Sequence, residues 1–425
     1  MTLTNEASTI SSSGGYRTYR QQSLSSTRNP NQPGANQYDL GSFNEAAIIE
    51  TIRRAGSISR TEIAQQTGLT QQSVSRILRL LLERGLLTEG TQERAERLGK
   101  PRTPVRIRPE AAHAAGVLVD PELLTVILSD LAGNVIQQRK LQLMPGTPPA
   151  ALVESIASLV EEVTTAAAVD SSTFLGVGVA VPGPISIDGN LLNLPLSEAW
   201  RDVPLKELLT QRLKCPVIVE KDGAAAAIGE RWIGGEERSG DFVYLYFGTG
   251  LGSGLVLNGD AYRGVSSNAG EFGQLCAIRL GRIDDSGAPQ LVRECNPTIA
   301  LPQIARELGY DGPAESYKDF CKVVGSGNRE AIKAAQQIAD VIALGAVALI
   351  DLLDLPMLVI GGPAFELEIQ QIVVSTIDHA VNSLPTARDA RKVTVESSLL
   401  GSEVGAIGAA SMIFHGSFSP SVRRI

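Results

Sequence analysis

The spacing of apolar residues changes near residue 108, and this change constrains the fold more than any other feature of the chain. Between residues 43 and 108, apolar side chains recur at the three- and four-residue spacings of helices. From Val117 onward, short apolar runs typical of strands alternate with helical segments. A chain of 425 residues is long enough for two or three domains. The sequence therefore predicts a small helical N-terminal domain followed by a larger α/β body.

Charge divides at the same place. Residues 1–108 carry 15 Lys and Arg against 9 Asp and Glu, whereas the remaining residues carry 23 against 37. A basic front end on an acidic body predicts a polyanionic partner for the front end alone. Ordinary variation in surface charge is the alternative explanation.

The cysteine and hydropathy patterns indicate an intracellular setting. The four cysteines, Cys215, Cys276, Cys295 and Cys321, have spacings of neither a zinc ribbon nor a disulfide framework. The longest apolar run, Val341 to Ile350, has about half the length that a membrane span needs. The first thirty residues lack the apolar core of a signal peptide. We therefore expect a cytoplasmic protein with reduced thiols and no membrane partner.

Residues 1–42 are rich in Ser, Asn, Gln, Thr and Gly and predict a disordered tail. Residues 43–108 predict three helices in succession. The first ends at Gly56, and the second, over 60–67, begins with a Ser59/Glu62 capping box. Thr70 caps the third helix. The buried stripe of that helix is expected to be Val74, Ile77, Leu78 and Leu81.

The second and third helices are joined by a glycine turn at Gly68, and the third is capped and amphipathic. This helix-turn-helix pattern predicts a DNA-binding unit. Leu86 and Leu87 then stand where the strand of a wing would begin. Gln can bond adenine, Arg can bond guanine, and Ser can reach a base or a phosphate. An amphipathic helix with a merely solvated polar face is the alternative. The residues expected to contact DNA on the capped helix are Thr70, Gln71, Gln72, Ser73, Ser75, Arg76 and Arg79.

A second DNA contact is predicted in the segment Leu98-Gly-Lys-Pro-Arg102. Gly and Pro favour a narrow, extended backbone, and Lys100 and Arg102 would enter the negative potential of an A·T-rich minor groove. The alternative is a basic linker between domains.

The body contains an ordered series of glycine-rich and acidic segments. They include Gly176 to Pro184, Trp200 to Leu205, Glu220-Lys-Asp222, Gly248-Thr-Gly-Leu-Gly-Ser-Gly254, Gly270-Glu-Phe-Gly273, Leu358-Val-Ile-Gly-Gly362, and the glycines from Gly401 to Gly408. In this order the segments resemble those of the ROK family, which combines sugar kinases with transcription regulators. Together with the N-terminal unit, the chain is similar to the regulator branch over nearly all of residues 43–410.

The resemblance implies an α/β architecture: an N-terminal winged helix-turn-helix and a two-lobed, actin-like (ribonuclease H-like) body. The expected domains are a tail at 1–42, a DNA-binding domain at 43–108, lobe 1 at 109–222 joined by a C-terminal helix at 403–425, and lobe 2 at 223–402. A homodimer or a dimer of dimers on double-stranded DNA is expected.

The first phosphate loop departs from the family pattern of Asp-x-Gly-Gly-Thr. Its positions fall on Leu118, Asp120, Pro121 and Glu122. Pro121 has no N–H to offer a phosphate, and two acidic side chains would repel a nucleotide. Phosphoryl transfer depends on positioning and charge stabilisation. We therefore expect no kinase activity and assign no catalytic residue. The second loop, 248–254, favours a tight hairpin, although its backbone could bind an anion.

The effector site implied by the resemblance consists of Asn193, Asp222 and Glu271. Asp222 stands where the kinases place a general base, and Lys221 replaces the family's Asn and could pair with Asp222. Gln274 replaces a zinc-binding His, and Cys276 and Cys295 lack the close spacing of a zinc site. We expect no metal and no cofactor.

The sequence thus favours a sequence-specific DNA-binding regulator, in particular a repressor of carbohydrate genes, with a sugar-type effector between the lobes. One alternative is a ROK kinase that phosphorylates a hexose with ATP. Another is a regulator controlled by a protein partner, favoured by the changes at Lys221, Gln274 and Val292, which stands where the resemblance implies a Glu that contacts sugar.

Overall fold

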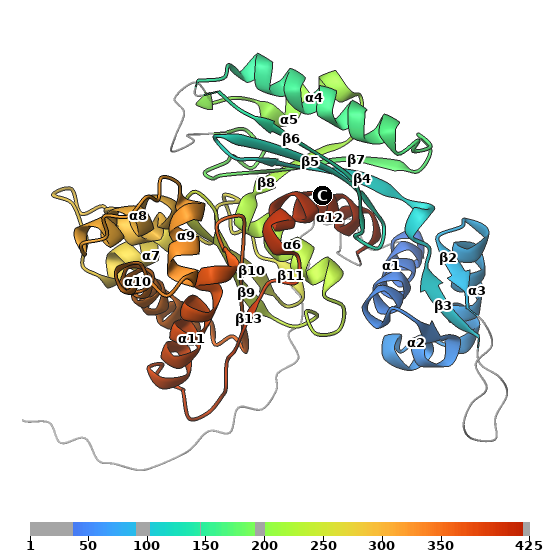
Figure 1. Ribbon diagram of the computed structural model, residues 1–425. Helices are drawn as coiled ribbons and strands as arrows, with labels where there is room; N and C mark the ends of the chain where they lie inside the picture. Colours follow the sequence, from blue (N-terminus) through green and yellow to red (C-terminus); the bar gives the residue numbers. More distant parts are fainter. Residues whose placement is uncertain (1–36, 91–102, 145, 192–199, 420–425) are drawn as a thin grey trace, which may run out of the picture. The chain divides into compact units, whose positions relative to one another are not determined.

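The N-terminal domain of the computed structural model consists of three helices and three short strands in the residues described, which are 37–90, 103–144, 146–191 and 200–419. The helices are α1 (Gln37–Ala55), α2 (Arg60–Thr67) and α3 (Gln71–Glu83), and the strands are β1 (Ile58–Ser59), β2 (Leu87–Glu89) and β3 (Pro104–Ile107) (Figure 1). The strands form one sheet in the order β1-β3-β2. The three helices and the three-stranded sheet form the winged helix-turn-helix that the sequence predicts.

Local capping explains where these helices begin. The Ser59 hydroxyl accepts the N–H of Glu62 while the Glu62 carboxylate accepts the N–H of Ser59, so the predicted capping box is confirmed. The Thr70 hydroxyl accepts the N–H of Ser73 at the start of α3. Gly68, between the two helices, has a φ of 69°, a left-handed conformation that favours glycine. Both helices therefore begin at the predicted residues, and α2 also ends where predicted.

The first helix starts earlier than expected. It begins at Gln37, inside the stretch predicted to be a disordered tail, so the predicted boundary at residue 42 is wrong for 37–42. Residues 1–36 lie outside the described part of the chain. Residues 42–425 form one compact unit.

The first sheet of the body has the strand order β6-β5-β4-β7-β8. These strands are β4 (His113–Val119), β5 (Leu123–Asp130), β6 (Val135–Gln142), β7 (Phe174–Val181) and β8 (Val217–Lys221), and the helices α4 (Pro149–Ala166) and α5 (Leu205–Leu213) pack on one face (Figure 1). Alternate residues of a strand point to opposite faces. Val117 and Val119 accordingly pack beneath α4 and α5, whereas Ala114 and Leu118 pack on the other face.

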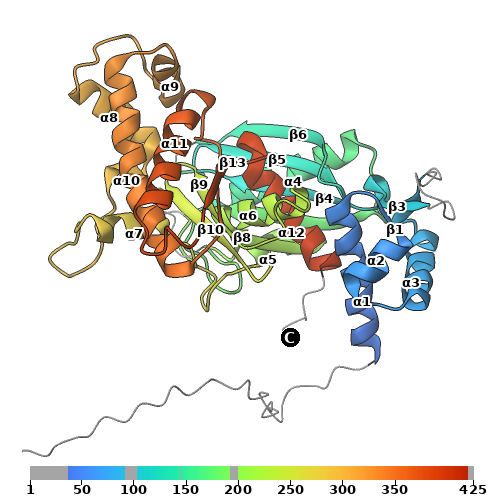
Figure 2. The same ribbon diagram turned by 90° about the horizontal axis from the view of Figure 1, so that it is seen from below.

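The second sheet has the order β11-β10-β9-β12-β13. Its strands are β9 (Phe242–Phe247), β10 (Leu251–Leu257), β11 (Asp260–Ala261), β12 (Met357–Gly361) and β13 (Thr394–Ser397). One face is covered by α7 (Phe272–Arg279), α8 (Pro297–Glu307), α9 (Tyr317–Gly325), α10 (Arg329–Leu353) and α11 (Leu367–Ser383) (Figure 2). Val243, Leu245 and Phe247 point into this helical layer, whereas Phe242, Tyr244 and Tyr246 point to the opposite face.

Two helices, α6 (Asp222–Ile233) and α12 (Val404–Phe418), pack against each other between the two sheets (Figure 1). Glycines allow their close approach to the strands. A Cβ at Gly116 would lie 2.0 Å from the carbonyl oxygen of Ala406, and one at Gly178 would lie 1.8 Å from that of Ala409. These contacts fix α12 on the first sheet. The sheet-based body with a helix-turn-helix front confirms the predicted fold class.

One described helix, α10, is long and apolar enough to cross a membrane by length and composition. Half of its most apolar window is buried inside the fold. Its buried side chains belong to the core of the second sheet.

Candidate functional site

The polar face of α3 is free to meet a ligand. Val74, Ile77, Leu78 and Leu81 are buried, as predicted. The side chains that alternate with them are exposed: Thr70, Gln71, Gln72, Ser75, Arg76 and Arg79, with Ser73 half-buried. The stripe of apolar residues therefore turns the amide and guanidinium groups outward together.

The two arginines of this face have no ion-pair or hydrogen-bond partner among the described residues. Two other arginines of this domain do form ion pairs. Arg60 pairs with Glu89 at 2.6 Å, and Arg84 pairs with Glu45. The charges of Arg76 and Arg79 are thus available to an external anion, which is what contact with a nucleic acid requires.

The predicted minor-groove residues Lys100 and Arg102 lie outside the described residues, as does Asn193 of the predicted effector site. In the sequence, the first two fall between the paired strands β2 and β3. Arg106 on β3 donates through Nε to the Ser57 hydroxyl at 3.1 Å.

The segment that replaces the first phosphate loop is a hairpin turn between β4 and β5. The N–H of Asp120 donates to the carbonyl of Leu123 at 3.0 Å, and the N–H of Glu122 donates to Oδ1 of Asp120 at 3.2 Å. The second loop is also a hairpin turn, because Phe247 and Leu251 are directly paired in β9 and β10. The hairpin predicted for residues 248–254 is confirmed.

The two turns are bonded to each other. The Thr249 hydroxyl donates to Oδ2 of Asp120 at 2.8 Å. The Asp120 carboxylate thus accepts the hydrogen bond that the Thr249 hydroxyl of the second glycine loop could otherwise donate to a ligand. A phosphate placed there would have to break this bond and would face the negative charge of Asp120.

Asp222 is the first residue of α6 and lies near the same carboxylate. Its burial raises its pKa to about 7, and the charges of Asp120 and Glu271 add to this effect. The N–H of Gly223, which donates to Oδ1 at 2.7 Å, and the charge of Lys221 oppose it. A carboxyl with this pKa exists in both protonation states near neutrality and can donate or accept a hydrogen bond.

The sequence suggested that Lys221 could pair with Asp222, but the structure shows no such bond. Its buried ammonium pairs with the Glu271 carboxylate and also donates to the carbonyls of Asn268 and Ala269, both at 3.4 Å. Asn268 in turn bonds the N–H and the carbonyl of Ile185, at 2.9 and 2.7 Å. Asp222 and Glu271 thus lie close enough for their charges to interact, and Lys221 pairs with Glu271, a partner that the sequence did not reveal.

The region expected to lack zinc contains Gln274, half-buried, and the buried thiols of Cys276 and Cys295. A hydrogen bond with Cys276 raises the pKa of the Cys295 thiol far above its usual range, and burial adds to this shift. Among the described residues, His, Cys, Asp and Glu side chains nowhere gather in threes as a metal site would need.

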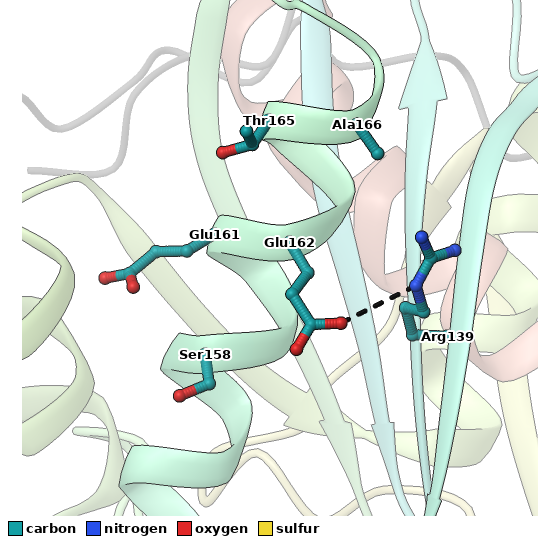
Figure 3. A pocket seen from close by; sticks show the side chains of 6 residues that line it. All are labelled: Arg139, Ser158, Glu161, Glu162, Thr165 and Ala166. Atoms are coloured by element: carbon teal, nitrogen blue, oxygen red, sulfur yellow. Dashed lines mark ion pairs between the residues drawn. The ribbon is translucent and has the colours of Figure 1, made fainter.

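A separate pocket lies between β6 and α4 (Figure 3). Arg139 and Glu162 form an ion pair of 3.6 Å in it, and Ser158 and Thr165 line its helical side. It contains none of the residues predicted to bind DNA or an effector, so it does not bear on either site.

Comparison with known proteins agrees with both parts of the structure. Residues 116–415 match the ROK family, and residues 42–98 match the MarR family. The xylose repressor of Bacillus subtilis (strain 168) is 24% identical over 384 residues, which cover 89% of this chain and 97% of the repressor.

Two solved structures share the fold. A ROK family transcriptional regulator, described as a homologue of the E. coli MLC protein, has a TM-score of 0.70 and 20% identity, with 90% of this chain and 98% of that one covered. A ROK family glucokinase from Streptomyces griseus, in complex with glucose and AMPPNP, has a TM-score of 0.61 and 23% identity, with 71% of this chain and 99% of that one covered. The kinase covers a smaller share of this chain than the regulator does.

Proposed function

The chain belongs to the ROK family, and on that premise we propose that it is a sequence-specific DNA-binding repressor of carbohydrate genes without kinase activity. The observation that carries this proposal is the exposed polar face of α3, where Arg76 and Arg79 have no partner in the described residues. Gln72 and Ser75 complete a surface suited to the edges of base pairs. The similarity to a protein named xylose repressor supports the link to carbohydrate.

The DNA partner in this proposal is a pseudo-palindromic operator. A homodimer would place two α3 helices in successive major grooves, one helical turn or a multiple of it apart. Lys100 and Arg102 would contact the adjacent minor groove, preferentially where it is A·T-rich. The proposed place of action is therefore the cytoplasm, where the DNA is.

The effector in this proposal is a carbohydrate held at Asp222 and Glu271. Sugar hydroxyls need polar partners to replace water. Asp222 can donate or accept near neutral pH, and Glu271 has 55% of its side chain exposed. Asn193 would be a third contact. Regulation follows if the sugar binds one conformation of the body better than another.

DNase I footprinting tests the proposal. DNA flanking the gene is incubated with the full chain at near-physiological salt, because affinity for DNA depends steeply on salt. We expect one or more protected sites with internal two-fold symmetry. The Arg76→Ala variant serves as the comparison, and absence of any protected site for the unaltered chain would contradict the proposal.

A kinase acting on a hexose is the second proposal, favoured by the carboxyl of Asp222 at the position of the family's general base. The Asp120–Thr249 bond opposes it. The test is ATP-dependent phosphate transfer to a panel of hexoses by the full chain and by Asp222→Asn. Transfer that is lost in the variant would support the kinase.

A further inference from the structure

One helix, α6, joins the predicted effector site to the DNA-binding domain. Its first residue is Asp222, and its last turn carries Arg231 and Trp232. A helix of 12 residues spans about 18 Å at 1.5 Å per residue. Residues Gly223 to Glu230 are buried throughout, so α6 is supported along its length. A helix that is buried along its length is suited to carry a displacement from one end to the other.

The N-terminal end of α6 is in close contact with the strand that follows the second glycine loop. A Cβ at Gly223 would lie 2.9 Å from the carbonyl carbon and oxygen of Ser253. The hydroxyl of Ser253 donates to the carbonyl of Gly270 at 3.1 Å, directly before Glu271. Movement around Glu271 thus reaches the start of α6 through Ser253, which is bonded to Gly270 and packed closely against Gly223.

The C-terminal end of α6 holds α1 through a buried group of side chains, which we call the junction cluster: Glu50 and Arg53 from α1, and Arg231 and Trp232 from α6. The Glu50 carboxylate accepts from Arg53 at 2.7 and 2.9 Å and pairs with Arg231 at 3.1 Å. These three side chains are 9%, 6% and 12% exposed.

Arg53, at the centre of the junction cluster, makes further contacts with α6. Arg53 donates to the carbonyls of Arg231 and Trp232, and its guanidinium lies 4.7 Å from the centre of the Trp232 ring. Burial raises the pKa of Glu50, but the bonds and charges of Arg53 and Arg231 outweigh it and the net shift is downward. Glu50 therefore stays ionised, and removing it would leave two buried cations facing each other.

We propose that α6 is the mechanical link that transmits a change at Asp222 and Glu271 to the DNA-binding domain, with Glu50 as the residue that couples α6 to α1. This inference rests on the proposed function, because it takes the site at Asp222 as the effector site. Glu50 is a positioning residue: it touches neither DNA nor effector and acts through Arg53 and Arg231.

The test displaces one end of α6 and observes the other. Gly223→Ala forces its Cβ against the Ser253 backbone, so the contact between the start of α6 and β10 must change. Hydrogen exchange of the α1 amides over residues 48–55 is measured by mass spectrometry in the full chain. We expect exchange there to rise at least about fivefold, the lower end of typical allosteric couplings.

The matched control is Gly345→Ala in α10, where a Cβ would lie 2.5 Å from Sγ of Cys276 inside the core of the second sheet. This control should change exchange in α7 and α10 and leave α1 unchanged. If both variants raise α1 exchange alike, the effect is general loosening and the proposal fails.

The decisive comparison places Gly223→Ala in a Glu50→Gln background. Coupling through Glu50 predicts that the increment caused by Gly223→Ala falls below about twofold, because the two changes are then non-additive. An increment that stays at fivefold would show that the signal bypasses Glu50 and would overturn the proposal.

Asp222→Asn provides a second perturbation of the same helix end, this time of charge rather than of volume, in case Gly223→Ala does not fold. It removes the repulsion by Asp120 and Glu271 at the same helix end, and the same two outcomes apply. Because exchange is measured without DNA, failure of the link is distinguishable from failure to bind an operator, which footprinting detects separately.

Discussion

The Thr249 hydroxyl donates a 2.8 Å hydrogen bond to the Asp120 carboxylate, and this bond joins the two turns that would have to hold a nucleotide in a kinase of this fold. The turns are 129 residues apart in the sequence. Asp120 belongs to the turn that replaces the first glycine-rich loop. Its carboxylate accepts the Thr249 hydroxyl of the second loop, so this hydroxyl already has a partner within the protein.

The first prediction concerns nucleotide binding. A ligand present at a hundred times its dissociation constant adds roughly 2.7 kcal/mol of stability. We expect Mg-ATP to leave the thermal midpoint unchanged, because Asp120 repels phosphate and Pro121 offers no N–H. A saturable rise in the midpoint with Mg-ATP, measured by differential scanning fluorimetry, would contradict this expectation.

The second prediction concerns base reading by α3. Arg76→Ala should weaken binding to the preferred site by roughly 1–3 kcal/mol and relax preference at one base pair. Fluorescence anisotropy on the preferred duplex and on its single-base variants measures both effects. The matched control is Arg282→Ala, an exposed arginine of the body that removes the same charge. Equal weakening on all duplexes would mean that Arg76 holds only phosphate.

The third prediction concerns pH. The pKa of Asp222 in the folded chain, about 7, lies above the unfolded value of about 3.9. A carboxyl raised in this way favours folding when protonated, so its contribution is present at acidic pH and is lost as pH rises towards 7. Asp222→Asn avoids this loss. Its stability relative to the unaltered chain should therefore improve by on the order of 2 kcal/mol between pH 5 and pH 8.

Urea unfolding at the two pH values measures this difference. Asp284→Asn is a suitable control, because hydrogen bonds from Ser286 and Ala288 lower the pKa of that carboxyl instead. A difference for Asp222→Asn that does not vary with pH would show that Asp222 is ionised throughout.

The fourth prediction concerns the packing of α12 against β7. Gly178→Ala would put a Cβ 1.8 Å from the carbonyl oxygen of Ala409. Because the obstacle is backbone, β7 and α12 must move apart, and we expect a loss of about 3 kcal/mol or more. Gly240→Ala, where a Cβ meets no atom within 4 Å, should cost less than about 1 kcal/mol. Tryptophan fluorescence during urea unfolding reports both, and equal costs would contradict the close packing.

Local signals in the sequence were sufficient for much of the fold. The caps at Ser59 and Thr70 placed the starts of α2 and α3 to the residue. Strand β6 was missed because Val135–Gln142 is an edge strand with few buried side chains and shows no clear alternation.

The sites were harder to predict because they depend on contacts between distant residues. The motif series placed Asp222 and Glu271 in one site, but Lys221 seemed a partner for its neighbour Asp222. The chain changes from β8 to α6 between these two residues, so adjacent side chains diverge and Lys221 reaches Glu271 instead. The Glu50–Arg231 pair has no local signature, since it joins α1 to α6 across 181 positions.

Selection of binding sites from a random duplex library shows whether this ROK chain recognises a DNA sequence. The full chain is compared with the double variant Gln72→Ala, Arg76→Ala. We expect the full chain to enrich an inverted repeat whose half-sites are centred about 10 base pairs, or a multiple of that, apart, and the double variant to lose that enrichment. Absence of any enriched sequence with the folded full chain would contradict the account.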